Sequence, residues 1–300
     1  MTVLALTRVT KRFGTVLALD GVSFAVKRGE VVGFVGANGA GKTTTIRTIL
    51  GFISASDGET KVFGTVVTPA GAHKLHRKIG YAAGDMGLPS KLTGAQFLRF
   101  TSGQFGGSHE PRLAELTNRF KPVLDKKIGT LSRGNKQKIA LIAAFMTNPE
   151  LIVLDEPTSG LDPLMQEVFL DLVREVQASG ATVFMSSHYL NEVADVCSRV
   201  ILMRDGKVVC DMATADMLEG SGKRIRIVTR YKATKPPAGA VDTEKTLEGN
   251  ELTLTFTYRG KPNELQVWVA GLKQLHDIEI TEHNLEGVFA SLYESEGGAK

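Results

Sequence analysis

The sequence predicts an α/β fold with a parallel sheet, followed by a small α+β appendage. Three short apolar runs, at residues 31–35, 151–154 and 181–185, have the length of buried strands, and helical patterns lie between them. Apolar strands that alternate with helices form parallel sheets covered on both faces. Beyond about residue 220, apolar and polar residues alternate with period two, which is typical of a half-exposed antiparallel sheet. We therefore expect two domains, residues 1–219 and residues 220–300.

The composition is that of a globular protein and gives no indication of nucleic-acid binding or of a membrane span. The chain has 300 residues, of which 42% are apolar and 23% charged, ordinary proportions for a globular protein with a sizeable core. The net charge is only +4, and the basic residues form short pairs and no extended patch, so we expect no nucleic-acid partner. No signal-peptide layout and no apolar run of ~20 residues is present, which predicts a cytoplasmic chain. Cys197 and Cys210 lack metal-ligand spacing and are interpreted as packing residues.

The opening region alternates strands and turns. We expect strands at residues 4–10 and 22–26, with turns at Gly14 and at the Asp20-Gly21 pair. Residues 27–30 then lead into the buried strand at residues 31–35. A glycine-rich loop follows this strand, and a helix begins near Lys42.

The middle of the chain, residues 72–144, is helical by periodicity apart from a strand at residues 79–81, and Pro111 and Pro122 divide it into pieces. The buried faces of these helices are assigned to apolar side chains at helical spacing: Phe97, Phe100, Phe105, Leu113, Leu116 and Phe120. A helix at residues 163–177 then separates the last two buried strands.

The appendage shows shorter elements. It is expected to hold a loop near residues 235–239, strands, one helix and a last helix that begins at Asn284. The expected strands lie at residues 224–229, 251–258 and 278–280, and the first helix lies at residues 263–275.

A glycine-rich loop after a buried strand predicts a triphosphate site. The loop reads Gly-Ala-Asn-Gly-Ala-Gly-Lys-Thr and is followed by a helix, which is the context of the P-loop pattern. Its backbone N–H groups and the helix N-terminus favour phosphate, Lys42 reaches the β- and γ-phosphates, and the hydroxyl of Thr43 is offered to Mg²⁺. The expected ligand residues for ATP are Gly36, Asn38, Gly39, Ala40, Gly41, Lys42, Thr43 and Thr44.

Two adjacent carboxylates follow the strand at residues 151–154. Asp155 at the strand tip suits Mg²⁺, and Glu156 is placed to face an attacking water. Two carboxylates after an apolar strand are also compatible with an ordinary strand end, but here a P-loop precedes them. The guanine-reading pattern Asn-Lys-x-Asp is absent from the sequence, which favours ATP over GTP.

At this point the chain resembles the ATP-binding-cassette (ABC) ATPase family, over about the first 215 residues. Leu131-Ser132-Arg133-Gly134-Asn135 occupies the place of the family's signature, and Ser159-Gly-Leu-Asp162 resembles the loop that links two dimer sites. His188 resembles the family's switch histidine, and Phe13 the aromatic residue that stacks on adenine. Taken alone, Phe13 is more typical of a core residue and His188 of a surface histidine, but their positions relative to the P-loop favour the functional assignments.

The resemblance implies a fold and a mechanism. The fold is a P-loop ATPase core with an antiparallel β subdomain and a helical subdomain at about residues 86–148. ATP lies between the P-loop of one subunit and the signature of another, so Ser132, Gly134, Asn135 and Asp162 act across a dimer. The partner is a second copy or a related ATPase subunit, and catalysis is assigned to Lys42, Glu156 and His188.

The sequence departs from the family pattern at two places. Arg133 and Asn135 replace a glycine and a glutamine of the signature. Gly84 stands where the family carries a glutamine that contacts Mg²⁺, and Asp85, one residue further on, is an alternative ligand for the metal.

The single cassette and its tail resemble the exporter branch of the family. That branch works with a separate integral membrane permease, which implies a location on the cytoplasmic face of the plasma membrane. The permease is expected to dock near residues 88–107. The resemblance implies cargo of the drug, antibiotic or polysaccharide class, although no residue of the cassette encodes the cargo. A soluble ABC-type switch without a membrane partner and a nucleotide binder without turnover are the alternatives.

Overall fold

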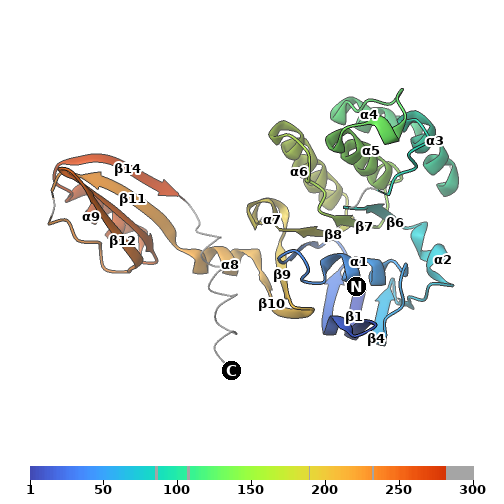
Figure 1. Cartoon of the computed structure of the whole chain (residues 1–300), viewed down its shortest axis with the longest axis horizontal. Helices are drawn as coiled ribbons and strands as arrows, with labels where there is room; N and C mark the ends of the chain where they lie inside the picture. The colour runs from blue at the N-terminus through green and yellow to red at the C-terminus, as the bar shows by residue number, and fades with distance from the viewer. Residues whose placement is uncertain (85–86, 107–108, 189, 232, 282–300) are drawn as a thin grey trace. The chain divides into compact units, whose positions relative to one another are not determined.

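The computed structural model describes residues 1–84, 87–106, 109–188, 190–231 and 233–281. The chain divides into two compact units, Met1–Met212 and Ala213–Lys300. Among the described residues, the N-terminal unit contains two sheets and the C-terminal unit one (Figure 1). Each unit has its own hydrophobic core. No helix in these described ranges is long and apolar enough to cross a membrane.

A six-stranded sheet forms the centre of the N-terminal unit. Its strands lie in the order β10-β9-β3-β8-β7-β6, and the pairs β9–β3, β3–β8, β8–β7 and β7–β6 are parallel. The predicted parallel sheet is therefore confirmed. The bounds are β3 Val31–Val35, β6 Ile79–Ala82, β7 Leu151–Asp155, β8 Thr182–Ser187, β9 Arg199–Arg204 and β10 Lys207–Ala213.

A second sheet in this unit is antiparallel, with the order β2-β1-β4-β5. Its strands are β1 Thr2–Phe13, β2 Val16–Lys27, β4 Asp57–Val62 and β5 Thr65–Val66. The turn predicted at Asp20-Gly21 is wrong, because both residues lie inside β2. Gly21 has φ +68° there, and the pairing of β1 with β2 shifts register on both sides of Val9, so a bulge absorbs the glycine. Sequence analysis did not identify β4 and β5, whose polar residues lack a clear alternation.

Helices cover both faces of the parallel sheet in the N-terminal unit (Figure 1). The apolar core between the two sheets includes Val32 and Phe34 of β3 and Ile46 of α1. A side chain on Gly33, which lies between Val32 and Phe34 in β3, would instead meet Val193 of α7. Alternate residues of β3 therefore contact opposite layers. The helices are α1 Lys42–Ile49, α2 Ala72–His76, α3 Gly94–Phe105, α4 Glu110–Phe120, the short 3₁₀ turn η1 Ile128–Thr130, α5 Arg133–Phe145, α6 Pro163–Ala178 and α7 Leu190–Val196.

Two details of the helical region differ from the prediction. Phe100 does not belong to a buried face, because its side chain is 61% exposed and α3 instead buries Leu98. Sequence periodicity did not fix the start of the helix after the signature-like segment. It begins at Arg133, because the hydroxyl of Ser132 accepts a hydrogen bond from the N–H of Asn135 and caps the helix. Pro111 lies in the first turn of α4, where a proline needs no hydrogen-bond partner.

The C-terminal unit contains one antiparallel sheet with the order β12-β13-β11-β14. The predicted helix ends at Ala270 and not at residue 275, since the last strand already begins at Leu275. β12 was missed because eight of its nine residues are exposed and mainly polar. The helix predicted from Asn284 lies outside the described residues. The bounds are α8 Thr214–Ser221, β11 Lys223–Thr229, β12 Ala240–Glu248, β13 Glu251–Tyr258, α9 Pro262–Ala270 and β14 Leu275–Thr281.

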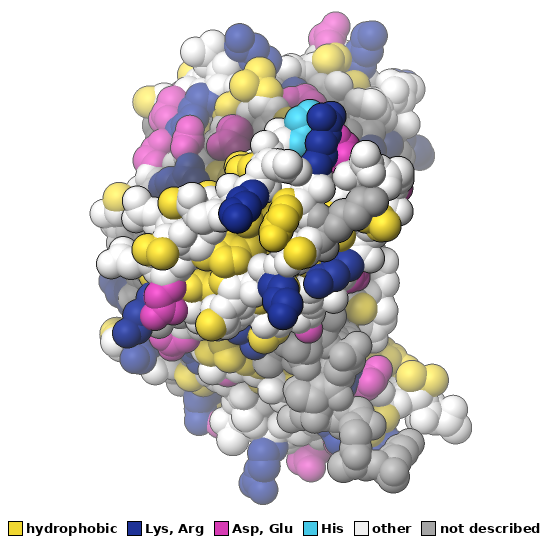
Figure 2. Space-filling model, turned by 90° about the vertical axis from the view of Figure 1, so that its left-hand side faces the viewer, with side chains coloured by type: hydrophobic (Ala, Val, Ile, Leu, Met, Phe, Trp, Pro, Cys, Tyr) yellow, Lys and Arg dark blue, Asp and Glu magenta, His cyan; other side chains and the backbone are white. Residues whose placement is uncertain are grey.

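Some large hydrophobic side chains reach the surface of the described parts of the chain. Phe52 and Phe100 are exposed in the N-terminal unit, and Val267 and Ile280 in the C-terminal unit. On the face that Figure 2 shows, hydrophobic side chains gather near the middle, with lysine and arginine side chains around them. Apolar surface of this kind marks candidate interaction sites.

Replacing a core aromatic residue tests the packing between the two sheets. The Phe184 ring lies 5.1 Å from that of Phe34 and 5.6 Å from that of Phe24, and Phe184 is fully buried. We expect Phe184→Ala to lower the free energy of unfolding by about 3–5 kcal/mol, measured by urea denaturation with circular dichroism. Phe100→Ala is the control, with an expected change of about 0.5 kcal/mol or less. Equal losses in the two variants would contradict this core assignment.

Candidate functional site

The glycine-rich loop lies between β3 and α1 and contacts its own lysine. The Nζ atom of Lys42 donates hydrogen bonds to the carbonyl oxygens of Gly36, at 2.6 Å, and Ala37, at 3.2 Å. Gly41 has φ +107°, and a Cβ atom there would lie 2.9 Å from the carbonyl oxygen of Ala18. Only glycine fits this point, because a side chain would meet both backbone strain and a neighbouring strand.

Asp155 is held at the end of β7 by two hydroxyl groups. Thr43 donates to its Oδ2 atom at 2.8 Å, and Ser186 donates to its Oδ1 atom at 2.6 Å. β3, β7 and β8 are neighbouring parallel strands, so their carboxyl ends meet at one edge of the sheet. Thr43 and Asp155 thus present oxygen atoms side by side, which is the donor type that Mg²⁺ prefers.

Glu156 lies between a lysine and a histidine. Its Oε1 atom is 3.8 Å from the Nζ atom of Lys42 and 3.5 Å from the Nδ1 atom of His188. Its backbone has φ +48°, a rare value for this residue type, and its N–H donates to the hydroxyl of Ser186 at 3.0 Å. Ser186 therefore orients both carboxylate residues, a role that sequence analysis did not assign to it.

Burial and neighbouring carboxylates act in opposite directions on the pKa of Lys42. Its side chain is 5% exposed, and this burial lowers the pKa of Lys42 below its ordinary value. The nearby carboxylates of Glu156 and Asp155 act in the opposite direction. A bound polyanion would add to their effect and favour the protonated lysine.

A cavity of about 400 Å³ opens beside this cluster. Its lining includes Glu156 and six of the predicted loop residues, Asn38, Gly39, Gly41, Lys42, Thr43 and Thr44. It also includes residues that the sequence analysis missed: Val16, Leu17, Ala18, Asp205 and Gly206. Asp205-Gly206 is recognisable as a turn, but no local pattern indicates that this turn borders the phosphate loop.

Phe13 and Ala40 lie outside that lining. Phe13 pairs with Val16 at the end of the β1–β2 hairpin, and its ring is 49% exposed, so it is not a core residue. Because Val16 borders the cavity, Phe13 and Val16 together place apolar surface next to it. Ala40 is buried, and its carbonyl oxygen accepts a hydrogen bond from Gly206 at 3.0 Å.

The signature-like segment lies at the N-terminus of α5 and does not line the cavity. The side chain of Asn135 donates to Ser132 at 3.2 Å and accepts from the N–H of Val123 at 3.1 Å. Arg133 donates to the hydroxyl of Ser159 at 2.6 Å. The segment is thus joined to the loop at residues 159–162, and one chain does not bring either of them to Lys42.

Two further residues support the segments around Glu156. Asp162 caps α6 by accepting a hydrogen bond from the N–H of Met165 at 3.0 Å. Gln137 is fully buried and donates to the carbonyl oxygen of Pro157 at 2.7 Å, which connects α5 to the residue after Glu156. A glutamine in a helix gives no sequence signal for this contact, so it was not predicted.

Gly84 lies directly against Asp155, the carboxylate expected to bind Mg²⁺. A Cβ atom on Gly84 would come 3.0 Å from the carbonyl oxygen of Asp155 and 3.5 Å from its carboxylate carbon. The position therefore adjoins the carboxylate even though glycine brings no ligand. Asp85, the predicted alternative ligand, lies outside the described residues.

Comparison with protein families and relatives identifies similar chains. A family model described as ABC transporter matches residues 19–159. The Bacillus subtilis protein YhaQ, an uncharacterized ABC transporter ATP-binding protein, is 30% identical over 294 residues, which cover 95% of this chain and 97% of YhaQ. The Escherichia coli protein YbhF, a probable multidrug ABC transporter ATP-binding protein, is 34% identical over 72% of this chain, and the match covers 38% of YbhF.

Solved structures are similar as well. The structure of an ATP-binding subunit of an ABC transporter has a TM-score of 0.67 at 30% identity, and covers 73% of this chain and 92% of its own. The ATP-binding cassette MJ0796, in a dimeric post-hydrolysis state bound to ADP and Pi, has a TM-score of 0.65 at 26% identity. That match covers 70% of this chain and 98% of MJ0796.

Gly134 offers a test of the junction between α5 and the loop at residues 159–162. A Cβ atom on Gly134 would lie 2.5 Å from the carbonyl oxygen of Gly160, a backbone atom that cannot rotate away. We expect Gly134→Ala to lower the free energy of unfolding by about 1–3 kcal/mol, measured by urea denaturation. In the control Gly103→Ala, on α3, the new Cβ meets nothing within 4 Å. The free energy of unfolding of that control is expected to rise by up to about 1 kcal/mol, because alanine has the higher helix propensity. A Gly134→Ala variant as stable as the unmodified chain would contradict the tight junction.

Proposed function

Because the chain belongs to the family of ABC transporter ATP-binding proteins, whose chemistry is ATP hydrolysis, we propose that it is the ATPase subunit of an exporter. In this proposal two copies close around two ATP molecules and drive a separate membrane permease. The convergence of Lys42, Thr43, Asp155, Glu156 and His188 at one edge of the parallel sheet carries the proposal.

ATP binds with its phosphates in the loop between β3 and α1. The backbone N–H groups of the loop and the N-terminus of α1 surround the phosphates, and Lys42 exchanges its two carbonyl partners for phosphate oxygens. The adenine ring stacks on Phe13 beside Val16, at the exposed apolar end of the hairpin. Asn38 and Thr44, which line the same cavity, supply further polar contacts.

Thr43 and Asp155 are the residues that hold Mg²⁺ in this proposal. Their oxygen atoms lie 2.8 Å apart and fit a hard cation that keeps several waters and phosphate oxygens in its shell. When bound, such an ion neutralises charge on the phosphates and orients them. Gly84 adds no ligand, so in this chain the metal side of the site depends on Thr43 and Asp155, with Asp85 as the further ligand proposed from the sequence.

Hydrolysis depends on the position of Glu156. Its carboxylate orients the attacking water or accepts a proton from it, while Lys42 and His188 stabilise charge on the γ-phosphoryl group. The hydrogen bond from the N–H of Glu156 to Ser186 holds the carboxylate residue in its strained backbone conformation. Positioning of this kind is the main contribution that proteins make to phosphoryl transfer.

The second half of each site comes from the partner copy. Ser132 and the N–H of Gly134 lie at the N-terminus of α5, where the helix dipole favours an anion, yet neither residue lines the cavity of its own chain. In a dimer they meet the γ-phosphate bound by the other copy. Arg133 and Asn135 then stabilise the segment through Ser159 and Val123, and Asp162 positions the linking loop by capping α6.

The permease docks on the N-terminal unit at a groove of about 470 Å³. The groove includes Leu88 and Phe97, within the segment expected to dock, and also Phe52 and Tyr81. Phe52 is 52% exposed, and an aromatic residue in a groove is a suitable anchor for a partner helix. In this arrangement the chain lies on the cytoplasmic face of the membrane through its permease.

The names of relatives support export of drug-like cargo. YbhF is a probable multidrug ABC transporter ATP-binding protein, and LnrL of Bacillus subtilis, 35% identical over 71% of this chain, is a linearmycin resistance ATP-binding protein. We propose a cargo of the drug, antibiotic or polysaccharide class for the transporter that this subunit powers. The permease would select the cargo, because in this proposal no residue of the cassette contacts it.

Replacing Glu156 by glutamine should separate binding from turnover. We expect Glu156→Gln to lower ATPase turnover about 10²-fold or more while ATP binding persists, since the carboxylate acts in the chemical step. Size-exclusion chromatography with light scattering should then show an ATP-dependent dimer. Glu167→Gln, an exposed change on α6, is the control and should retain turnover without trapping a dimer. A Glu156→Gln protein that stays monomeric with ATP would refute the dimer mechanism.

The permease groove is tested by recovery of partners. Tagged Glu156→Gln protein with ATP should capture a polytopic membrane protein from detergent-solubilised membranes of the source organism, identified by mass spectrometry. Adding Phe52→Glu should reduce that recovery about tenfold or more, because the anchor becomes charged. Val66→Glu, at a 45% exposed residue outside the groove, is the matched control. Recovery of soluble partners alone, where known membrane complexes survive, would favour a soluble switch.

A further inference from the structure

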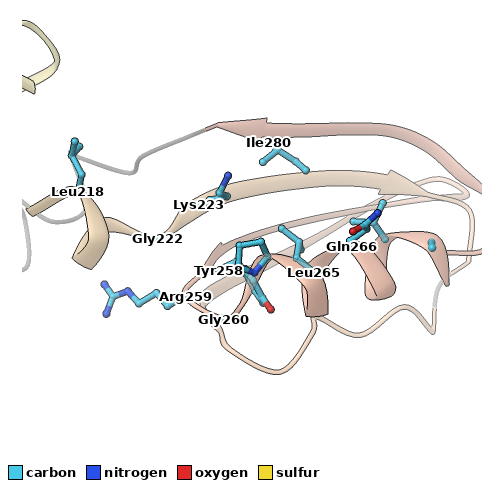
Figure 3. A pocket seen from close by; sticks show the side chains of 12 residues that line it. Leu218, Gly222, Lys223, Tyr258, Arg259, Gly260, Leu265, Gln266 and Ile280 are labelled. Atoms are coloured by element: carbon cyan, nitrogen blue, oxygen red, sulfur yellow. The ribbon is translucent and has the colours of Figure 1, made fainter. Parts of the chain in front are cut away.

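The C-terminal unit has a large apolar groove that its own helix only partly fills. The groove has a volume of about 980 Å³ and is lined by residues of α8, β11, β13, α9 and β14 (Figure 3). Tyr258 and Leu265 are nearly fully buried beneath it. Ile280 of β14 also lines it but remains 44% exposed, so apolar surface is left without a complete cover.

The uncovered surface belongs to the same face of the sheet as the core of the unit. Ile280 is paired in register with Ile225, a fully buried core residue, across β14 and β11. Side chains at paired positions lie on one face of a sheet, so Ile280 continues the face on which α9 packs. The groove is therefore an extension of the hydrophobic core, and α9, with nine residues, is too short to cover it.

The charged residues of the groove have one sign. Among the described residues, Lys223 and Arg259 are the two charged residues in its lining, and both are basic. Figure 3 shows Arg259 at one end of the group of lining side chains. A partner that fits this groove therefore combines an apolar face with acidic residues.

The chain contains a segment with this pattern directly after the groove. Residues 282–300 follow Thr281, and Thr281 pairs with Arg224, next to Lys223 in the lining. Leu285, Val288, Phe289 and Leu292 have the spacing of one helix face. The acidic residues Glu282, Glu286, Glu294 and Glu296 outnumber the single basic Lys300.

We propose that the apolar face of residues 285–292 docks in this groove within the same chain and completes the core of the C-terminal unit. Leu285 is only four residues beyond Thr281, so the tether is short and the effective concentration of the segment is high. Burial of four large apolar side chains supplies the driving force, and the glutamates face Lys223 and Arg259. The proposal is independent of the transport function.

Hydrogen exchange followed by mass spectrometry on the full chain is the first test. Amides of residues 286–292 should exchange at least about tenfold more slowly than in an unstructured peptide, because docking requires opening before exchange. The double variant Phe289→Glu/Leu292→Glu should lose this protection and also expose amides of α9 and β14. Ala290→Glu is the matched control, since position 290 lies on the opposite helix face, and it should keep the protection.

A dye-binding measurement on the same proteins reports whether the groove is open. Anilinonaphthalene sulfonate, an apolar anion, should bind the double variant at least about tenfold more than it binds the unmodified chain or the control. Strong dye binding by the unmodified chain would overturn the proposal and indicate a groove open to small apolar anions. Equal exchange in all three proteins would overturn it as well. Protection that rises with protein concentration, with cross-links between isotopically distinct copies, would assign the groove to a second copy.

Discussion

The structure depends on the parallel pairing of β3 with β8 and of β8 with β7. Parallel strands end at the same edge of a sheet, so this pairing brings the loop after β3, the carboxylates after β7 and the histidine after β8 together. Asp155 is then held by hydroxyl groups from both neighbouring segments, Thr43 and Ser186. Because its two oxygen atoms are both engaged, a shift of any of the three strands would disturb the whole site.

The same constraint separates the signature-like segment from the glycine-rich loop within one chain. The phosphate loop and Glu156 are fixed by the parallel sheet, whereas the signature-like segment is fixed by α5 and by its contacts with Val123 and Ser159. Each group is held by its own hydrogen bonds, and the signature-like segment does not line the cavity beside Lys42. In the proposed dimer, closure between two copies would unite them and would give ATP a role in assembly as well as in chemistry.

The hydrophobic cores of the two units are covered in different ways. The core of the N-terminal unit is enclosed between two sheets and α1, with the rings of Phe24, Phe34 and Phe184 in contact. In the described part of the C-terminal unit, up to Thr281, a single sheet carries one short helix on its core face, and Ile280 is exposed there beside a groove. A sheet with one face partly uncovered needs a further element, and the acidic, amphipathic end of the chain is a suitable one.

The sequence by itself determined the α/β class, the phosphate loop, the paired carboxylates and the family, because these depend on local spacing and on apolar runs of strand length. It did not reveal Ser186, Gln137 or Asp205 as site residues, since their roles come from contacts between segments far apart in the chain. It also misassigned Asp20-Gly21 and Phe100. A strand bulge absorbs a turn-like pair, and only packing decides which face of α3 is buried. Tertiary structure decides such positions because burial and register are properties of neighbours, which a local pattern does not contain.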